Sequence, residues 1–187
     1  MAVAHLVLIN GAPGSGKSTL ARLYAAEHPL TLVLDIDVVR GLLGGWLERP
    51  VEAGLLARQM GLEMARVQLL RGGDVLVPQF LGRIDFVVQL ENLASEVGAE
   101  FVEIALLSDP EDASARFARR VSHPETAEHH DAVALLQRSG GLAALPGLYE
   151  RLLEVVAARP RTRQVATVEG EVEETYQRLL AGIAHFS

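Results

Sequence analysis

The sequence predicts an α/β fold in which a parallel sheet of five strands is covered by helices on both faces. Short apolar runs alternate with longer helical stretches along the whole chain, a pattern typical of strand–helix–strand units. With 49% hydrophobic and 22% charged residues, the composition is that of an ordinary globular protein. A length of 187 residues suits one domain with an ample core, so we expect residues 1–187 to form a single domain.

The expected elements follow one another in a regular order. Strands are predicted at Leu6–Ile9, Thr31–Leu34, Val75–Val77, Phe101–Leu107 and Gln164–Val168. Helices are predicted at Lys17–His28, Val38–Glu48, Val51–Arg71, Gly82–Val97, Glu111–Val121, Glu128–Arg138, Pro146–Ala158 and Glu171–His185. Gly72, Gly73 and Gly98 are placed to end helices. Because ligands of open parallel sheets bind at the carboxyl ends of the strands, the residues that follow each strand are the candidates for function.

A glycine-rich loop joins the first strand to the first helix. Gly11–Thr19 matches the pattern G-x-x-x-x-G-K-[ST] at Gly11, Gly16, Lys17 and Ser18. Glycines let successive N–H groups turn toward an anion, and the following helix N-terminus adds partial positive charge. Lys17, the single lysine in the chain, is expected to reach the β- and γ-phosphates, and the Ser18 hydroxyl to ligate Mg²⁺. The predicted nucleotide-binding residues are Gly11, Pro13, Gly14, Ser15, Gly16, Lys17, Ser18 and Thr19.

The second strand ends in an acidic pair, Asp35 and Asp37. In an extended segment, residues two apart point to the same side, so both carboxylates are expected to face the γ-phosphate. Phosphoryl transfer needs a metal ion held firmly and an acceptor hydroxyl oriented by a carboxylate. We expect Asp37 to be the base or acceptor anchor and Asp35 to be a partner of Mg²⁺. The alternative is that Asp37 only caps the helix beginning at Val38.

Together, Gly11–Thr19, Asp35-Ile-Asp37 and Arg40 resemble the small P-loop kinases, which include shikimate, gluconate and adenylylsulfate kinases, chloramphenicol phosphotransferase and the zeta-toxin group. A similarity to AAA-type ATPases is expected for the same loop. The resemblance implies a P-loop NTPase three-layer sandwich, ATP and Mg²⁺ as cofactors, and a small helical lid. In those kinases, an acidic motif at a comparable distance after the loop lysine lies beside the acceptor.

The third strand departs from a common pattern, because Gln79 stands where many such proteins have an acidic residue. This departure has two interpretations: the metal is held by its other ligands, and Gln79 contacts the acceptor. We favour the two together. Arg40 and Arg83 have the spacing of arginines in nucleoside-monophosphate kinases and would clamp an anionic acceptor. The alternative for Arg83 is a solvated residue at a helix start. Trp46 is expected to line the acceptor pocket.

The later part of the chain is expected to supply a lid at about residues 116–140. By resemblance to related kinases, Arg116 and Arg120 are predicted to be catalytic and Arg119 to bind nucleotide. Which of the three contacts the phosphates is left open. The spacing between the histidines of this lid does not match that of a zinc-binding motif. In related kinases the loop near the last strand contacts the adenine, so the resemblance implies that Arg163 lies by the adenine.

The amino-acid composition excludes several classes of binding partner and site. Lys+Arg 17 against Asp+Glu 24 gives a net charge of −7, which argues against binding long nucleic acids. The absence of cysteine excludes disulfides and thiolate-ligated metals. Neither a membrane-spanning run nor a signal peptide is predicted, so a cytoplasmic location is expected.

The predicted function is ATP- and Mg²⁺-dependent phosphoryl transfer to a hydroxyl of a small-molecule acceptor. Two alternatives stay open. One is a kinase whose acceptor is an anionic nucleotide or nucleotide sugar. The other is a non-kinase regulatory protein that binds NTP and hydrolyses it slowly. The acidic pair favours an enzyme, because a switch does not need a second acidic site beside the γ-phosphate.

Overall fold

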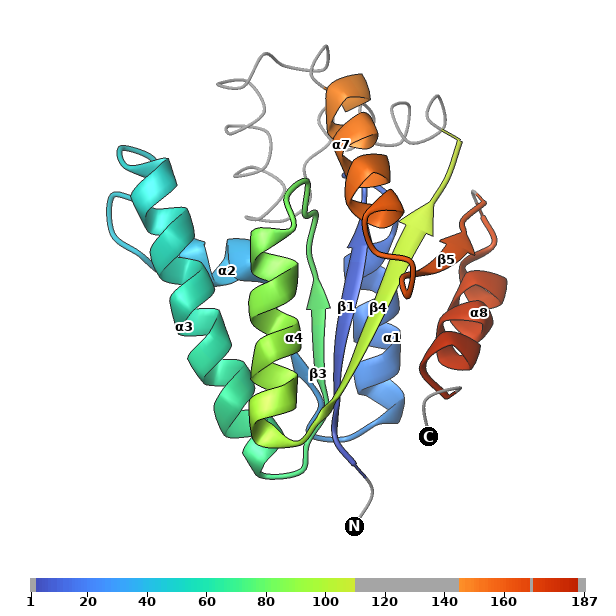
Figure 1. Cartoon of the computed structure of the whole chain (residues 1–187), viewed down its shortest axis with the longest axis horizontal. Coiled ribbons are helices and arrows are strands. Elements are labelled where there is room, and N and C mark those ends of the chain that lie inside the picture. The colour runs from blue at the N-terminus through green and yellow to red at the C-terminus, as the bar shows by residue number, and fades with distance from the viewer. Residues whose placement is uncertain (1–2, 110–144, 169, 185–187) are drawn as a thin grey trace.

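The computed structural model describes residues 3–109, 145–168 and 170–184, which form one parallel sheet with helices on both faces (Figure 1). The strands are β1 (His5–Gly11), β2 (Leu32–Val33), β3 (Val75–Pro78), β4 (Glu100–Leu107) and β5 (Arg163–Ala166). The helices are α1 (Lys17–Glu27), α2 (Ile36–Gly41), α3 (Pro50–Leu70), α4 (Asp85–Val97), α7 (Leu145–Ala157) and α8 (Val172–Ala184). The sheet order is β2-β3-β1-β4-β5, and every pairing is parallel. The predicted three-layer α/β fold of five strands is confirmed.

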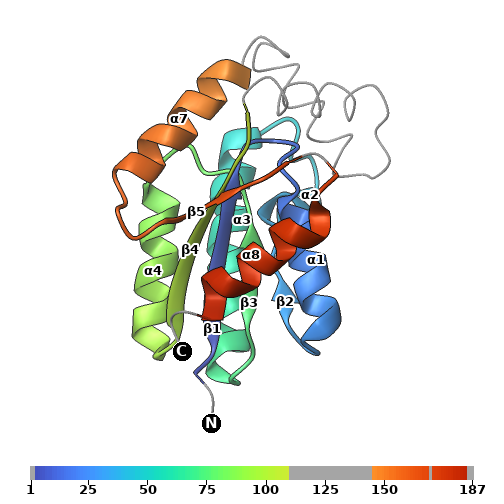
Figure 2. The same ribbon diagram turned by 90° about the vertical axis from the view of Figure 1, so that its right-hand side faces the viewer.

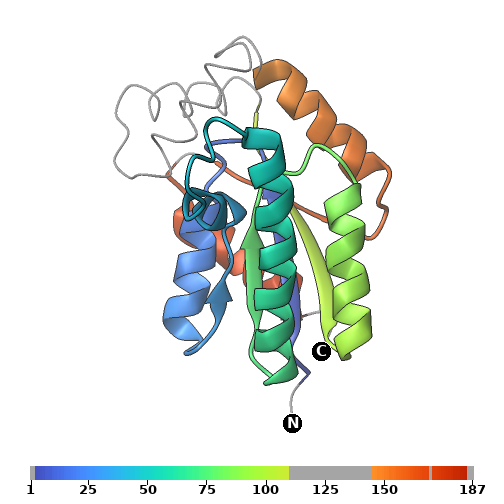
Figure 3. The same ribbon diagram turned by 90° about the vertical axis from the view of Figure 1, so that its left-hand side faces the viewer.

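Strand β1 lies at the centre of the sheet and divides the core into two layers. Leu6 and Leu8 point into a cluster formed with α3 and α4, whereas Val7 and Ile9 point into a cluster formed with α1 and α8. All four side chains are fully buried. Because successive side chains of a strand alternate between faces, an uninterrupted apolar run suits a strand covered on both sides. Figures 2 and 3 show α1 and α4 on opposite faces of the sheet.

The helix predicted at Val38–Glu48 is wrong at both ends. Helix α2 begins at Ile36, because the Asp35 side chain accepts a hydrogen bond from the Asp37 backbone N–H (2.9 Å) and caps the helix. It ends at Gly41. Turns follow as far as Arg49. Within them Gly45 has a φ of 67°, a left-handed conformation that is incompatible with a helix continuing to Glu48. The lid at 116–140 and the helices at 111–121 and 128–138 lie outside the described residues.

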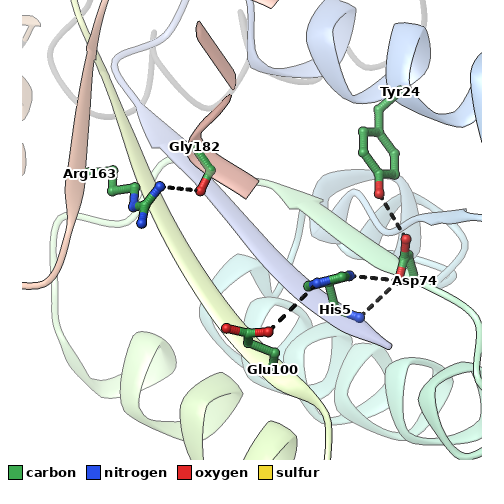
Figure 4. A network of polar contacts seen from close by, with 6 residues as sticks. All are labelled: His5, Tyr24, Asp74, Glu100, Arg163 and Gly182. Carbon is green, nitrogen blue, oxygen red and sulfur yellow. Dashed lines mark hydrogen bonds and ion pairs between the residues drawn. The ribbon is translucent and has the colours of Figure 1, made fainter. Parts of the chain in front are cut away.

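A polar network ties β1, β3, β4 and α1 together at the amino edge of the sheet (Figure 4). The Asp74 carboxylate accepts hydrogen bonds from the His5 backbone N–H (2.8 Å) and the Tyr24 hydroxyl (2.8 Å). The His5 ring lies 3.3 Å from Asp74 and 3.7 Å from a Glu100 oxygen. The hydrogen bond with Asp74 is the main cause that raises the pKa of His5 above 6.5. His5 therefore gains a proton more readily in the folded state than in the unfolded state.

Replacing His5 with glutamine is expected to remove a pH-dependent part of the stability. Since the folded pKa is raised, the contribution of charged His5 is fully present below the unfolded pKa of 6.5 and is lost as pH rises through the folded pKa. The difference in free energy of unfolding between wild type and His5→Gln should shrink from mildly acidic to mildly alkaline pH. Urea unfolding across that range measures it. A difference that is constant with pH would contradict the assigned ion pairs.

Candidate active site

The carboxyl ends of β1, β2 and β3 bring the sequence-predicted residues to one edge of the sheet. The phosphate loop follows β1, the acidic pair follows β2, and Gln79 follows β3. Hydrogen bonds join these ends directly, because Gln79 N–H donates to the Ile9 carbonyl (3.1 Å) and Leu34 N–H donates to Leu76 (2.8 Å). Three chain segments far apart in sequence therefore meet where an open parallel sheet binds ligands.

The glycines of the phosphate loop have the conformations that the motif requires. Gly14 and Gly16 have φ values of 84° and 91°, in the left-handed region that side chains disfavour. Gly11 is needed for a different reason, since a Cβ there would lie 2.6 Å from the Ser15 hydroxyl oxygen. Ser15 is itself buried, and its N–H donates to the Ala12 carbonyl (3.1 Å). These residues form a tight turn that only small side chains allow.

Lys17 and Ser18 begin helix α1, immediately after the turn. The Lys17 ammonium donates to the Ala12 carbonyl (2.9 Å) and lies 3.5 Å from the Ser15 hydroxyl, so the side chain folds back over the loop. Ser18 is half-buried in the first helical turn, Pro13 is half-buried and Thr19 is exposed. The positive charge of Lys17 and the N-terminus of helix α1 thus lie together, as an anion site requires.

The acidic pair does not have the geometry predicted for it. Asp35 and Asp37 are not two positions of one extended segment, because Asp35 caps helix α2 and Asp37 lies in its first turn. Burial raises the pKa of Asp35, and the negative charge of Asp37 raises it further, while the charge of Lys17 acts in the opposite direction. The charge of Lys17 therefore acts on the Asp35 carboxyl. The alternative that Asp37 is the helix cap is also wrong.

Replacing Asp35 with asparagine is expected to stabilise the ligand-free protein near neutral pH. Because the folded pKa is raised above 3.8, ionised Asp35 costs stability at pH values above that range, and the neutral amide removes this cost while it still accepts the Asp37 N–H. The same variant should weaken Mg²⁺-dependent ATP binding by about 10–100-fold. Thermal unfolding and nucleotide titration measure the two effects. A variant that lost stability near neutral pH would contradict the assigned cost.

Arg40 is enclosed by its own helix and the turns that follow. Its Nη1 donates to Asp37 Oδ1 (2.9 Å), and its guanidinium carbon lies 4.6 Å from the centre of the Trp46 ring. The Arg40 side chain is only 11% exposed, and Trp46 is buried. Its Nε and Nη2 atoms are buried and have no hydrogen-bond partner among the described residues. The structure thus brings three predicted substrate residues, Asp37, Arg40 and Trp46, into contact.

The loop after β3 holds the two remaining predicted substrate residues. Gln79 is half-buried, and its Oε1 is buried without a partner in the described part of the chain. Pro78 is the last residue of β3, as expected for a residue without an N–H. Arg83 is exposed just before α4, which fits the alternative of a solvated residue.

Asn10, which the sequence analysis did not single out, links the phosphate loop to the loop after β3. Its side chain is 1% exposed; Oδ1 accepts from the N–H groups of Gly11 (2.9 Å) and Leu81 (2.9 Å), and Nδ2 donates to the Leu81 carbonyl (3.1 Å). The only sequence signal is a polar residue at the end of a buried apolar strand. The three bonds hold the two loops at a fixed separation.

Replacing Asn10 with alanine should lower the free energy of unfolding by about 2–3 kcal/mol, because two buried N–H groups lose their acceptor. Asn92→Ala, at an exposed position of α4, is the matched control and should change it by less than about 0.5 kcal/mol. Urea unfolding of both variants measures the difference. Equal losses in the two would show that the link contributes nothing.

A cavity of about 220 Å³ lies between the phosphate loop and the loop from β5 to α8. It is lined by Gly14, Ser15, Gly16, Thr19, Leu20, Thr167, Val168, Gly170, Glu171, Val172 and Thr175. Arg163 is not among these residues, and its place by the adenine stays a prediction. Its guanidinium donates to the Gly182 carbonyl (2.6 Å) in α8 (Figure 4).

Two statements apply to residues 3–109, 145–168 and 170–184, the part of the chain that the structure describes. In these ranges, no group of three or more His, Cys, Asp or Glu side chains is arranged to hold a metal ion. The same ranges contain no helix with both the length and the apolar character needed to cross a membrane.

Comparison with solved structures identifies the fold. A suspected kinase from Chloroflexus aurantiacus has a TM-score of 0.67 at 16% identity, with 100% of both chains covered. A gluconokinase from Sinorhizobium meliloti 1021 has a TM-score of 0.61 at 17% identity, covering 100% of this chain and 95% of that one. The APS kinase CysC of Mycobacterium tuberculosis, solved with AMPPNP and APS, has a TM-score of 0.62 at 18% identity, covering 98% and 99%. This chain therefore has the fold of the small P-loop kinases.

The search of curated proteins found no match. The model of one protein family, described as an AAA domain, matches residues 6–140. This match spans more than half of the chain and includes the phosphate loop, the acidic pair and the loop after β3. The chain belongs to the AAA domain family.

Proposed function

We propose that this protein is a kinase that transfers the γ-phosphoryl group of ATP, with Mg²⁺, to a hydroxyl of a small-molecule acceptor. One observation carries the proposal. The phosphate loop after β1, the acidic pair after β2 and Gln79 after β3 meet at the carboxyl edge of the sheet, where β3 lies between β1 and β2. A protein that only hydrolysed NTP would not need a second carboxylate at this edge, held by Arg40, in addition to Asp35.

The residues of the loop fit a nucleoside triphosphate. Gly11 leaves room for the tight turn, and the left-handed conformations of Gly14 and Gly16 orient N–H groups for an anion. On binding, Lys17 exchanges the Ala12 carbonyl for phosphate oxygens, which are stronger partners of an ammonium group. The cavity beside the loop, lined by Thr19 and the β5–α8 loop, has a suitable position for the nucleobase.

The residues also fit a magnesium ion, which prefers oxygen ligands and keeps several waters. The Ser18 hydroxyl would hold it directly, and Asp35 would hold it through water. When bound, Mg²⁺·ATP supplies the phosphoryl group and the positive charge that offsets negative charge as the group is transferred. The amide of Gln79 adds no negative charge to the metal site.

Asp37 is the residue that we assign to the acceptor. Its Oδ1 is held by Arg40, and its side chain is 40% exposed at the same sheet edge. A fixed carboxylate there accepts a hydrogen bond from the acceptor hydroxyl, orients it toward the γ-phosphate and receives its proton. The lid arginines Arg116, Arg119 and Arg120, which lie outside the described residues, stay proposed partners of the phosphates.

The comparisons support the choice of a kinase over a hydrolase. Two of the similar structures are a gluconokinase and an APS kinase, and the second was solved with AMPPNP and APS. Both names describe enzymes that phosphorylate small molecules. The low identities leave the acceptor of this chain to be determined.

A screen for ADP release tests the proposal. Purified protein with ATP and Mg²⁺ is assayed against a panel of hydroxylated compounds, such as polyols, sugar acids and nucleosides. A kinase releases ADP faster when its acceptor is present, and the rate saturates with acceptor concentration. A slow release that no compound stimulates would instead favour a nucleotide-binding regulatory protein.

A further inference from the structure

We propose that two copies of this chain associate through the outer side of helix α3, with the two helices packed antiparallel about a two-fold axis. The surface that forms the contact, called here the α3 face, consists of six exposed apolar side chains: Leu30, Leu55, Leu56, Met60, Met64 and Val67. The inference goes beyond the proposed kinase function and does not depend on it.

The packing of α3 within the chain shows which of its sides are occupied. Small residues four apart lie against the core, namely Ala53, Ala57, Gly61 and Ala65. One flank of the helix faces α4, because Arg66 Nη2 donates to Glu96 (2.9 Å). On the same flank, the Arg58 guanidinium carbon lies 5.6 Å from the centre of the Phe86 ring. The core side and this flank therefore have partners within the chain.

The opposite flank of α3 is apolar and exposed. Leu56, Met60 and Met64 each directly precede one of the small core residues. Arg58 and Arg66 each directly follow one, so at 3.6 residues per turn the two sets lie on opposite flanks. The three apolar side chains are between 38% and 46% exposed, and Figure 3 shows no other described element in front of α3. Because a surface helix normally has polar side chains where solvent reaches it, an apolar flank marks an interaction site.

Leu30 extends the α3 face beyond the helix. Its carbonyl accepts a hydrogen bond from Gln68 Nε2 (2.6 Å), which holds the turn before β2 beside the C-terminal half of α3. Leu30 is 91% exposed and has a φ of 67°, the left-handed region that a leucine adopts at a cost. In one copy nothing offsets this cost, since the side chain lies in water. Packing against a partner supplies the missing burial.

A second copy of the chain suits this face because the charges at its two ends are complementary to each other. Glu52 and Arg71 are both exposed, and they lie equally far, about 14 Å, on either side of the midpoint of α3. A two-fold axis at that midpoint brings the partner's Arg71 opposite Glu52, and by symmetry forms the same ion pair twice. The antiparallel arrangement also places opposite helix dipole ends together.

The same register matches the apolar side chains. Leu56 lies opposite the partner's Val67, and Met60 and Met64 of both copies meet beside the axis. Methionine side chains are flexible and adapt to such a contact. Glu63 is the charged residue nearest to the axis on the outer side, and Arg66 Nε lies 3.6 Å from it, so its charge is offset within each copy.

The area of the α3 face is close to what a specific dimer needs. At on the order of 100 Å² of apolar surface for a fully exposed aliphatic side chain, six side chains that are 38–91% exposed present about 300 Å². Apolar groups make up about 60% of a typical interface, so the footprint on each copy is about 500–600 Å². Two copies then bury about 1,100 Å² in total, just above the roughly 1,000 Å² expected of a biological interface.

Sedimentation velocity of the purified full chain tests the proposal. An interface of this size is expected to give a dissociation constant in the micromolar range, so a concentration series from about 1 to 300 µM spans the transition from monomer to dimer. The same series with AMPPNP and Mg²⁺ should give the same dissociation constant, because the α3 face is not part of the phosphate loop. The measured quantity is a mass, which is independent of ADP release.

Met64→Lys should weaken the dimer by about 100-fold, since it places two like charges beside the axis. Leu153→Lys in α7 is the matched control, because Leu153 is also 42% exposed but lies outside the α3 face. It should sediment like wild type. Far-UV circular dichroism and AMPPNP affinity like those of wild type show that both variants are folded.

A charge exchange tests the antiparallel register. Glu52→Arg places like charges opposite each other twice and should weaken the dimer by about 10-fold. Adding Arg71→Glu to the same chain recreates both ion pairs with their signs reversed, and should restore the dimer. A double variant that is weaker than Glu52→Arg alone would contradict this register.

The proposal is overturned if wild type stays monomeric across the whole series, which would leave the α3 face to a different protein. A dimer that Met64→Lys does not weaken would also overturn it, because the contact would then lie on another surface. Equal weakening by Leu153→Lys would have the same meaning. The ADP-release screen remains a separate test, so failure of the dimer and failure of the kinase are distinguishable.

Discussion

Replacing Lys17 with alanine is expected to lower kcat/KM for phosphoryl transfer by about 10²–10³-fold. The ammonium group of Lys17 carries a positive charge at the phosphate loop, and Lys17 is the single lysine in the chain. In the ligand-free protein it donates to the Ala12 carbonyl (2.9 Å), a contact that phosphate oxygens replace. Because negative charge moves onto those oxygens during transfer, the ammonium stabilises the transition state more than the bound substrate.

The loss should be catalytic rather than structural. The Lys17 side chain is only half-buried, so its removal should change the free energy of unfolding by no more than about 1 kcal/mol. Steady-state kinetics and urea unfolding of Lys17→Ala separate the two effects. The single lysine allows a further check in wild type, because an amine-reactive acyl phosphate of ATP should label Lys17 and excess ATP should protect it. A variant with full activity would contradict the assigned phosphate site.

Replacing Asp37 with asparagine is expected to lower kcat by about 10²–10⁴-fold, the range associated with removing a general base. The amide oxygen of asparagine can still accept the hydrogen bond from Arg40 Nη1, so the variant removes the charge and the basicity while it preserves the contact. ATP affinity should stay close to that of wild type, because Asp37 is assigned to the acceptor rather than to the nucleotide.

Asp85→Asn provides the control for this measurement. Asp85 also lies in the first turn of a helix, but it is exposed, and no role is assigned to it. Its kcat should equal that of wild type. If Asp37→Asn kept a wild-type kcat with its acceptor, Asp37 would not be the base, and Asp35 would become the better candidate for contact with the reacting groups.

The phosphate loop was predictable because its residue types carry their own geometry. Left-handed φ values at Gly14 and Gly16 and the close approach at Gly11 are what glycines at these positions allow. The central strand was predictable for a similar reason, since only a strand covered on both faces is uniformly apolar. In both cases the signal lies within a few consecutive residues.

The acceptor side was less predictable, because its geometry depends on contacts that the local sequence does not reveal. The acidic pair was expected on an extended segment, but the capping bond from Asp35 starts helix α2 before Asp37. Asn10 was missed because its partner Leu81 lies 71 positions away in the sequence. The sequence alone likewise does not specify that the Nε and Nη2 atoms of Arg40 are buried without a hydrogen-bond partner among the described residues.

The destination of the γ-phosphoryl group tests the central claim most directly. Phosphorus NMR of a reaction with ATP, Mg²⁺ and a stimulating acceptor distinguishes a phosphate ester of that acceptor from inorganic phosphate. Our account predicts that a phosphomonoester signal appears as fast as ADP with wild type and is strongly reduced with Asp37→Asn. If inorganic phosphate were the only product, at the same rate in wild type and Asp37→Asn, the protein would be a slow NTPase and not the kinase proposed here.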